Sequence, residues 1–408
     1  MKRFGQTIRL KPNALEAYTV LHAQPWTEVL EALAQIHIRN YSIFRFGLTL
    51  FAYLEYRGTD WEADQRLMAS QPRLAKWAAL TADMQQPLEV LTDSGLHELA
   101  YCVRGVIFQD LVQRRIRSEL LGQDPLMREY LWHRVWELDR IEELPLYVLG
   151  VVDVALWDLA AKSANVPLYK LLGGYRERLP ACASTVTFGS TEEFLDVTDQ
   201  CLELGYPAIK LHAWGDAKRD AALCLALRDH VGSDVPLMYD GSAGFDLADA
   251  IHVGRALEEA DYLWYEEPMR EFSIIAYEQL SQNVRVPLLV AETSDGAHMN
   301  TADFIASGCA TFVRTGHGLK GGVTGAMRIA HLADAFRLRV EVHGSDIINT
   351  HLCMAIPNTT YYESLVRTNP IIREARVDSS GFVHAPTGVG VGFEENWEHD
   401  PWKVLMGV

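Results

Sequence analysis

The amino-acid sequence predicts an α/β protein in which a (β/α)8 barrel follows a smaller α+β domain. The barrel is predicted by three short apolar runs that each end in an acid, at Asp240, Glu266 and Glu292, with successive acids 26 positions apart. Each unit of such a barrel takes roughly 30 residues, and its strands end at one face. The smaller domain is predicted by a strand–helix–hairpin–helix–strand order in residues 1–104, which is a ferredoxin-like pattern.

The composition sets limits on size and on binding partners. A chain of 408 residues suggests two or three domains, and 49% apolar residues supply a large core. The formal net charge of −17 argues against nucleic acid or an anionic membrane as a partner. A small anionic substrate is still compatible with this charge, because a local metal ion and a lysine can outweigh it.

The cysteines and the N-terminus indicate a cytoplasmic protein. The six cysteines are scattered and form no CxxC pair, which is typical of buried thiols in a reducing compartment. The first residues include no apolar signal region, and no run of 18 apolar residues occurs. We therefore expect neither secretion nor membrane insertion.

The three acids that end the apolar runs predict a metal site. Asp240, Glu266 and Glu292 would converge at one face of the barrel and repel one another unless a hard cation lay between them. Carboxylate oxygens suit Mg²⁺. The alternative is that each acid caps the helix that follows it. Because the three acids are equally spaced along the chain, we favour the metal site.

The first domain is predicted from alternating and helical apolar patterns. Residues 88–95 contain a turn signal with little periodicity and mark the end of this domain. The expected elements are a strand over 4–10, a helical run from 12 to 33, a hairpin of 36–46 and 48–56, short helices over 61–69 and 72–79, and a last strand over 96–103.

Three segments of this domain resemble the L-rhamnose mutarotase family. They are Arg3-Phe-Gly-Gln-Thr-Ile-Arg-Leu-Lys-Pro, Tyr18-x-x-x-His22-x-x-x-Trp26 and Ile38-Arg-Asn-Tyr41-Ser-Ile-Phe. The resemblance implies an enzyme that interconverts sugar anomers without a cofactor. It implies that His22 is the acid/base, that Tyr18 and Tyr41 line the sugar site, and that Trp77 stacks on the sugar.

The chemistry suits these residues, although the match departs from the family at one position. Tyr18 and His22 are four residues apart and share a helix face, and histidine titrates in the range that anomer exchange needs. The family has two adjacent tryptophans, whereas Ala78 follows Trp77 here. One alternative is that the helix face with the histidine is only the more solvent-exposed side of a packed helix. Another is that the domain serves as a lid or a dimerisation module.

The remainder of the chain is predicted as three helices followed by the barrel. The helices are expected over 106–121, 125–138 and 143–164.

Residues 105–395 resemble the mandelate racemase-like branch of the enolase superfamily. The resemblance lies in the motifs Val151-Val-Asp-Val-Ala-Leu-Trp-Asp, Lys210-Leu-His212, Tyr265-Glu-Glu-Pro268, Gly321-Gly-Val-Thr324 and His384-x-Pro386-x-Gly388. It implies a modified TIM barrel with a capping domain. The barrel strands that it implies lie over 179–186, 208–213, 237–240, 263–266, 288–292, 311–314, 338–343 and 361–363. We therefore expect a mutarotase-like domain over 1–104, capping helices over 105–145 and the barrel over 146–408.

The same resemblance implies roles for individual residues. Lys210 would meet the substrate carboxylate, and on a strand it shares a face with His212. The implied roles are metal ligation by Asp240, Glu266 and Glu292, proton transfer by His212, His343 and Glu363, and substrate contact by Ser242, Arg314 and His317. The alternative for His212 is a filler side chain on a barrel strand.

Three departures from this family affect the site. The aspartate that orients the histidine base is replaced by Gly316, so that His317 or Glu341 would have to substitute. Ser242 stands where asparagine is common. The mutarotase-like domain lies where the capping strands and their mobile loop should be, and such a lid excludes water.

We expect the chain to remove the proton α to a carboxylate with the help of Mg²⁺. A divalent cation and a lysine stabilise the enediolate, and a histidine takes the proton. The favoured reaction is dehydration of a sugar acid, such as L-rhamnonate or L-fuconate, to a 2-keto-3-deoxy acid, fused to a sugar mutarotase. The alternatives are an epimerase or racemase, and an active mutarotase on a degenerate barrel scaffold. Both families imply a homo-oligomer.

Overall fold

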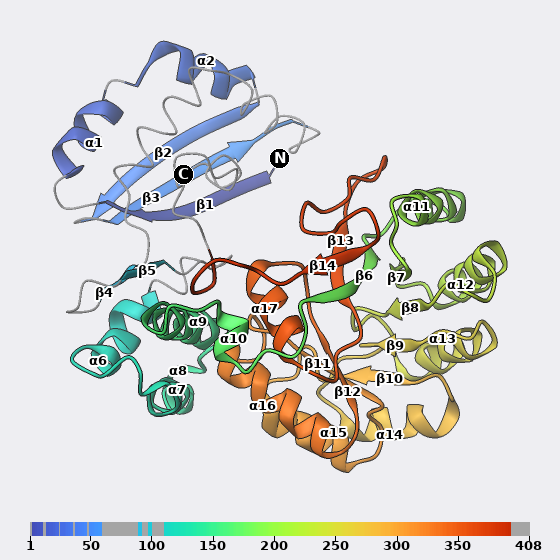
Figure 1. The fold of residues 1–408 in the computed structure, drawn as a ribbon. Coiled ribbons are helices and arrows are strands. Elements are labelled where there is room, and N and C mark those ends of the chain that lie inside the picture. The colour runs from blue at the N-terminus through green and yellow to red at the C-terminus, as the bar shows by residue number, and fades with distance from the viewer. Residues whose placement is uncertain are drawn as a thin grey trace. The chain divides into compact units, whose positions relative to one another are not determined.

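The chain divides into two compact units, which are described separately (Figure 1). One unit comprises Met1–Glu89, Val103–Arg114 and Glu394–Val408, and the other comprises Val90–Cys102 and Arg115–Phe393. The structure, a computed structural model, describes residues 2–10, 14–23, 25–35, 37–46, 49–58, 89–91, 97–99 and 110–392. Among these residues, none of the helices combines the length and the apolar character needed to cross a lipid bilayer.

The first unit is built on an antiparallel sheet in the order β1-β3-β2. Its elements are β1 (Lys2–Arg9), α1 (Leu15–Ala23), α2 (Thr27–Gln35), β2 (Ile38–Phe46) and β3 (Thr49–Tyr56). Leu10, Tyr18 and Leu50 form a small buried cluster. The register of β2 against β3 shifts between Arg39 and Ser42, which places a bulge in the hairpin.

The predicted hairpin is confirmed, and the predicted helical run is wrong in one respect. The run from 12 to 33 is interrupted between α1 and α2 at Pro25 and Trp26. Proline lacks the amide hydrogen that a continuous helix would need there. The two short helices expected over 61–69 and 72–79, and with them Trp77 and Ala78, lie outside the described residues.

The second unit begins with a two-stranded sheet and a group of helices. Within the predicted last strand of the first domain, the structure has a short strand, β5 (His97–Leu99). It pairs with β4 (Glu89–Leu91) rather than with β1 or β3. The predicted helix over 106–121 contains a π-helical segment, η2 (Val112–Ile116). The helices that follow are α6 (Arg117–Leu120), α7 (Arg128–Trp136), α8 (Asp139–Glu142), α9 (Leu146–Ser163) and α10 (Leu168–Leu171).

The predicted barrel is confirmed. Its parallel strands run in the order β12-β11-β10-β9-β8-β7-β6-β13, and the two end strands β12 and β13 contact each other. The strands are nearly continuous buried runs, as expected where helices cover a parallel sheet. They are β6 (Arg178–Thr185), β7 (Ala208–His212), β8 (Leu237–Asp240), β9 (Trp264–Glu266), β10 (Leu288–Val290), β11 (Phe312–Thr315), β12 (Arg339–Val342) and β13 (Tyr362–Val366), and β14 (Phe382–His384) pairs antiparallel with β6.

Helices cover the outside of these strands (Figure 1). They are α11 (Thr191–Glu203), α12 (Ala217–Val231), α13 (Leu247–Glu259), α14 (Ile274–Asn283), α15 (His298–Ala306), α16 (Gly322–Ala335) and α17 (Ile347–Ala355). Many begin with a side chain that accepts hydrogen bonds from the first backbone amides, which fixes where the helix starts. These capping residues are Ser190, Asp216, Asp246, Ser273 and Asp346.

Helix α16 is capped by a residue from a distant part of the sequence. The buried carboxylate of Asp153 on α9 accepts hydrogen bonds from the backbone amide of Thr324 at 2.8 Å and from its hydroxyl at 2.6 Å. Gly322 allows this close approach, because a Cβ atom there would lie 2.4 Å from Oδ2 of Asp153. Its φ of +82° also favours glycine. The Gly-Gly-Val-Thr motif is therefore the place where α9 joins the barrel.

We predict that Gly322→Ala destabilises the protein more than Gly122→Ala. Both glycines have positive φ, but a Cβ at residue 122 meets no atom within 4 Å. The backbone strain of about 1–2 kcal/mol is common to both variants, and only residue 322 adds an overlap, which costs about 1–3 kcal/mol. Denaturant unfolding of the two variants measures the difference. Equal losses would mean that the space beside Asp153 does not limit residue 322.

Candidate active site and metal centre

The three acids predicted to converge do so at the carboxyl ends of adjacent strands. Asp240 ends β8 and pairs in register with Glu266 at the end of β9, and Glu292 follows β10 by two residues. All three are buried, and each offers an oxygen atom within 4.8 Å of those of the other two. The spacing of 26 residues thus corresponds to three neighbouring strand ends.

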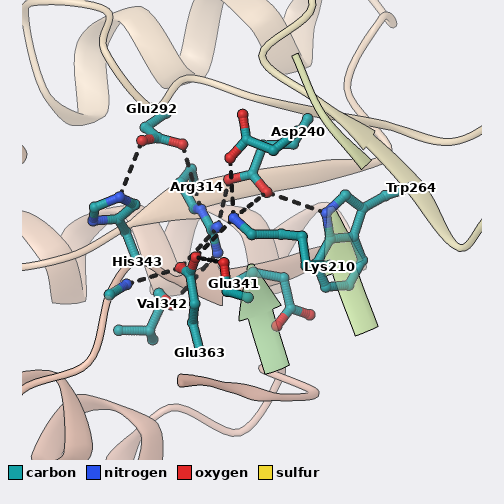
Figure 2. Close-up of polar contacts among 12 residues, drawn as sticks. Lys210, Asp240, Trp264, Glu292, Arg314, Glu341, Val342, His343 and Glu363 are labelled. Carbon is teal, nitrogen blue, oxygen red and sulfur yellow. Dashed lines mark hydrogen bonds and ion pairs between the residues drawn. The ribbon is translucent and has the colours of Figure 1, made fainter. Parts of the chain in front are cut away.

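Lys210 lies at the centre of this group (Figure 2). Its Nζ atom is 3.0 Å from Oδ2 of Asp240, 2.9 Å from Oε2 of Glu266 and 2.8 Å from Oε1 of Glu363. The side chain is only 1% exposed. Burial alone would lower the pKa of this lysine, but Glu266 and Glu363 raise it well above its usual value. Lys210 is therefore a fixed positive charge.

Arg314 is a second buried cation beside the same acids. Its Nη2 atom forms ion pairs with Glu266 and, at 3.0 Å, with Glu363. Its Nε atom lies 3.7 Å from Oε2 of Glu292. The structure places the Arg314 guanidinium beside Glu266, Glu292 and Glu363. Its predicted contact with the substrate stays a prediction.

Two histidines each contact a different acid of this set. Nε2 of His212 lies 2.9 Å from Oδ2 of Asp240, and Nε2 of His343 lies 3.1 Å from Oε1 of Glu292. The other ring nitrogen of His212, Nδ1, is 2.6 Å from the carbonyl oxygen of Thr185. Burial opposes the charged form of His343, but Glu292 raises its pKa to about 9. Lys210 and His212 do share one site, as their alternation on β7 predicts.

Glu363 does not occupy the position of a free proton donor. Its carboxylate accepts hydrogen bonds from the Ser184 hydroxyl at 2.9 Å and from the Gly344 amide at 2.9 Å, besides its two ion pairs. Burial would raise its pKa, but Lys210 and Arg314 hold the pKa well below its usual value. In this arrangement Glu363 is an ionised acceptor, which differs from the donor role that the resemblance implies.

The charges of this group fit a divalent cation. We call Asp240, Glu266 and Glu292 the metal set. Two of their oxygens, Oε1 of Glu266 and Oε2 of Glu292, are buried and accept no hydrogen bond within residues 110–392. Arg314 lies beside both oxygens. Burial raises the pKa of Glu266 well above its usual value, which is the cost of holding an anion without enough positive charge. A hard cation with oxygen ligands would satisfy these atoms.

Ser242 supports the metal set rather than an open pocket. Its amide and hydroxyl donate to Oδ1 of Asp240 at 2.8 Å and 3.3 Å. The residue has a φ of +46°, which turns the backbone back toward the acid. The structure gives Ser242 a contact with a candidate metal ligand, and its predicted contact with the substrate stays a prediction.

Neither candidate substitute for the missing aspartate contacts His343 through a hydrogen bond within residues 110–392. Glu341 accepts hydrogen bonds from Thr360 and Tyr361. His317 forms a hydrogen bond with Asp346 instead. The ring of His343 is oriented by Glu292, a member of the predicted metal set.

Two supporting residues were not predicted from the sequence. Glu271 is buried, and its carboxylate accepts hydrogen bonds from the amides of Ala291, Thr293 and Ser294, which surround Glu292 in the chain. The Nζ atom of buried Lys320 donates to the Ser294 carbonyl at 2.8 Å. Burial lowers the pKa of Lys320 to about 8. No spacing or motif marks these residues, because they act on backbone atoms of a loop.

In the first unit, two of the predicted sugar-site residues stack on each other. The rings of Tyr18 and His22 are nearly parallel, with centroids 3.8 Å apart. Burial lowers the pKa of His22 and raises that of Tyr18, to which nearby Tyr41 also contributes. Tyr18 is buried and Tyr41 is 43% exposed. The fourth predicted residue, Trp77, lies outside the described residues.

Three family models match different parts of the chain. Residues 194–399 match the enolase C-terminal domain-like model, and residues 83–173 match the N-terminal domain of mandelate racemase and muconate lactonizing enzyme. Residues 3–100 match L-rhamnose mutarotase. The second match begins upstream of residue 105 and includes β4 and β5, so capping-domain sequence starts before the helices that we assigned to it. The boundaries drawn at residues 104 and 145 stay predictions.

Characterised relatives and solved structures cover most of the second unit. The chain is 28% identical to 3,6-anhydro-alpha-L-galactonate cycloisomerase of Streptomyces coelicolor, over 72% of this chain and 83% of the relative. It is 27% identical to L-talarate/galactarate dehydratase of Salmonella typhimurium, over 72% of this chain and 75% of the relative.

A crystal structure provides the corresponding structural match. D-glucarate dehydratase from Agrobacterium tumefaciens, complexed with magnesium, is 32% identical with a TM-score of 0.69, and the match covers 74% of this chain and 86% of that one. The family models, this sequence identity and the acids at the strand ends all point to one family. The chain belongs to the enolase superfamily, and its N-terminal segment matches the L-rhamnose mutarotase model.

Proposed function

We propose that the barrel dehydrates a sugar acid to a 2-keto-3-deoxy acid with Mg²⁺ as its cofactor. The observation that carries this proposal is the buried set of Asp240, Glu266 and Glu292, with a lysine among them and a histidine on either flank. This is the arrangement needed to form and stabilise an enediolate. The dehydratases of talarate or galactarate, arabinonate and gluconate among the relatives support the same class of substrate.

Some residues of the site would supply or hold charge, and others would transfer protons. Asp240, Glu266 and Glu292 would hold Mg²⁺, which when bound supplies the positive charge that stabilises an enediolate. Lys210 adds a second positive charge beside the substrate carboxylate. A histidine, His212 or His343, removes the proton from the carbon next to that carboxylate. The β-hydroxyl then leaves as water, and the enol product becomes the 2-keto acid.

We propose an aldonate of a 6-deoxy sugar, such as L-rhamnonate or L-fuconate, as the substrate. The support is the N-terminal segment that matches L-rhamnose mutarotase. A mutarotase acting on the free sugar and a dehydratase acting on the derived acid would serve one pathway. In the first unit His22 would move the proton between the anomeric hydroxyl and the ring oxygen.

An epimerase or racemase is the second candidate for the barrel. The observation in its favour is that His212 and His343 contact different members of the metal set, Asp240 and Glu292. Two bases on two sides of one carbon can remove a proton from one face and return it to the other. A racemase from Streptomyces coelicolor with bound magnesium is also similar, at 26% identity and a TM-score of 0.66. A scaffold without chemistry is disfavoured, because unpaired buried carboxylates are costly.

We predict that Glu266→Gln abolishes 2-keto acid formation. The variant removes one charge from the metal set, and losing one stabilising group for a developing anion costs roughly 10²–10³-fold in kcat. A colour test for 2-keto acids on a library of acid sugars with Mg²⁺ measures the rate. Mg²⁺ at about 100 times its Kd should also stabilise the wild type by about 2.7 kcal/mol, and this shift should shrink in the variant.

The matched control is Glu259→Gln, at an exposed acid that ends α13. It should keep both the activity and the stabilisation by Mg²⁺. If the wild-type protein bound no Mg²⁺ and converted no acid sugar, the barrel would be a scaffold without chemistry rather than a dehydratase.

We predict that the variants His212→Asn and His343→Asn separate the two candidate reactions. A dehydratase needs one histidine as its base, so one variant should lose α-proton exchange by about 10²–10⁴-fold while the other keeps it. An epimerase needs both histidines, so both variants should fail to invert the carbon. Proton NMR in D2O follows the α-proton signal. Wild-type exchange rates in both variants would mean that neither histidine is the base.

We predict that His22→Ala abolishes acceleration of L-rhamnose anomer exchange. The variant removes the proposed acid/base, for which a loss of about 10²–10⁴-fold is expected. Saturation-transfer NMR on the sugar measures the exchange rate. His22→Ala should keep barrel activity, and Glu266→Gln should keep anomer exchange, so each variant controls for the other. No acceleration by the wild type would refute the mutarotase role.

A further inference from the structure

A second histidine–carboxylate pair lies at the face of the barrel where the metal set lies. His317 follows the end of β11 by two residues, and Asp346 follows the end of β12 by four. Nε2 of His317 is 2.8 Å from Oδ2 of Asp346. Because a carboxylate only accepts hydrogen bonds, Nε2 carries the proton and donates it. Nδ1 of the neutral ring is then the basic nitrogen.

The basic nitrogen of His317 is available for proton transfer. Among the residues that the structure describes, nothing forms a hydrogen bond with Nδ1, and the side chain is 20% exposed. The ring is thus fixed on one edge by a carboxylate and open on the other. A histidine with these two properties is suited to general acid–base catalysis.

The pair is fixed to the backbone at His343. The Asn349 side chain donates to the His343 carbonyl at 2.6 Å and to Oδ2 of Asp346 at 3.1 Å, and its oxygen accepts from the His317 amide at 3.4 Å. A Cβ atom at Gly316 would lie 3.5 Å from Cβ of His343. The loop that carries His317 therefore lies directly against the residue proposed as a base.

The histidine and the carboxylate of this pair occupy two loops that the family uses in the reverse order. The resemblance places the aspartate at the end of β11, where Gly316 stands, and the histidine at the end of β12. Here an additional histidine comes from the first loop and its carboxylate from the second. His343 itself is bound to Glu292. The loop that carries His317 thus lies against His343, and the two histidines have different carboxylate partners, Asp346 and Glu292.

We propose that His317, held by Asp346, gives a proton to the departing β-hydroxyl, a step that rests on the dehydration proposed above. A base takes the α-proton, and the electron pair of that C–H bond forms the enol double bond. The bond from the β-carbon to its hydroxyl oxygen breaks, and His317, which in its protonated form carries a second proton on Nδ1, gives that proton to the oxygen to release water. The enol becomes the 2-keto acid, and solvent returns a proton to His317.

A structural role is the alternative, because the hydrogen bond between His317 and Asp346 also fastens the β11 loop to the start of α17. The two roles differ in one respect. A proton donor matters only when the leaving group needs a proton, whereas a fastening residue matters for every substrate. Fluoride leaves without a proton, so a substrate with fluorine in place of the β-hydroxyl separates the two roles.

The test compares wild type, His317→Gln and Asp346→Asn on L-rhamnonate, L-fuconate or whichever acid sugar the wild type converts, and on its 3-deoxy-3-fluoro analogue. We expect His317→Gln to lose water elimination by about 10²-fold or more. The same variant should release fluoride at a rate close to that of the wild type and should keep α-proton exchange in D2O. Asp346→Asn should lose less than His317→Gln, because the histidine remains.

The matched control is His331→Gln, at an exposed histidine on α16, which should behave as wild type on both substrates. Thermal melting checks that each variant is folded. The inference is overturned if His317→Gln eliminates water normally, or if it loses water and fluoride elimination equally. Wild-type protein that eliminates neither group from any acid sugar would overturn the proposed function, and this inference with it.

Discussion

Four buried carboxylates, those of Asp240, Glu266, Glu292 and Glu363, lie on the barrel strands or directly after them and repel one another. The neighbouring residues are arranged to offset that repulsion. Lys210 and Arg314 lie among them and together contact all four. Two positive charges do not balance four negative ones, which is why burial still raises the pKa of Glu266. The site is therefore prepared for a further cation, and the histidines on its flanks gain their orientation from the same acids.

The sequence predicted the features of this site that depend on chain periodicity. Equal spacing identified the three strand-end acids, and alternation along β7 placed Lys210 and His212 in one site. It did not predict Glu271 or Lys320, because these residues bind backbone atoms of the loop around Glu292. It also did not predict that Arg314 pairs with these acids, since a cation near a strand end can face either a substrate or other side chains. Only the three-dimensional neighbours distinguish these cases.

In the first domain, local patterns predicted the hairpin but not the partners of more distant strands. Alternating β-rich residues on either side of a short turn give a hairpin with little dependence on the remaining chain. The strand at residues 97–99 was correctly located, yet it pairs with β4. A strand of three residues carries too little pattern to specify its neighbour. The helical run failed at Pro25, where a missing amide outweighs the apolar spacing.

The capping of α16 by Asp153 has a consequence for the order in which the chain assembles. The two partners are 171 residues apart in sequence, and Asp158 reaches Val391 across 233 residues. Contacts of such long range form late and slow folding, because a long loop must close first. During synthesis α9 emerges before any barrel strand, with two acids whose partners do not yet exist. This helix can therefore complete its buried contacts only after nearly the whole barrel has been synthesised.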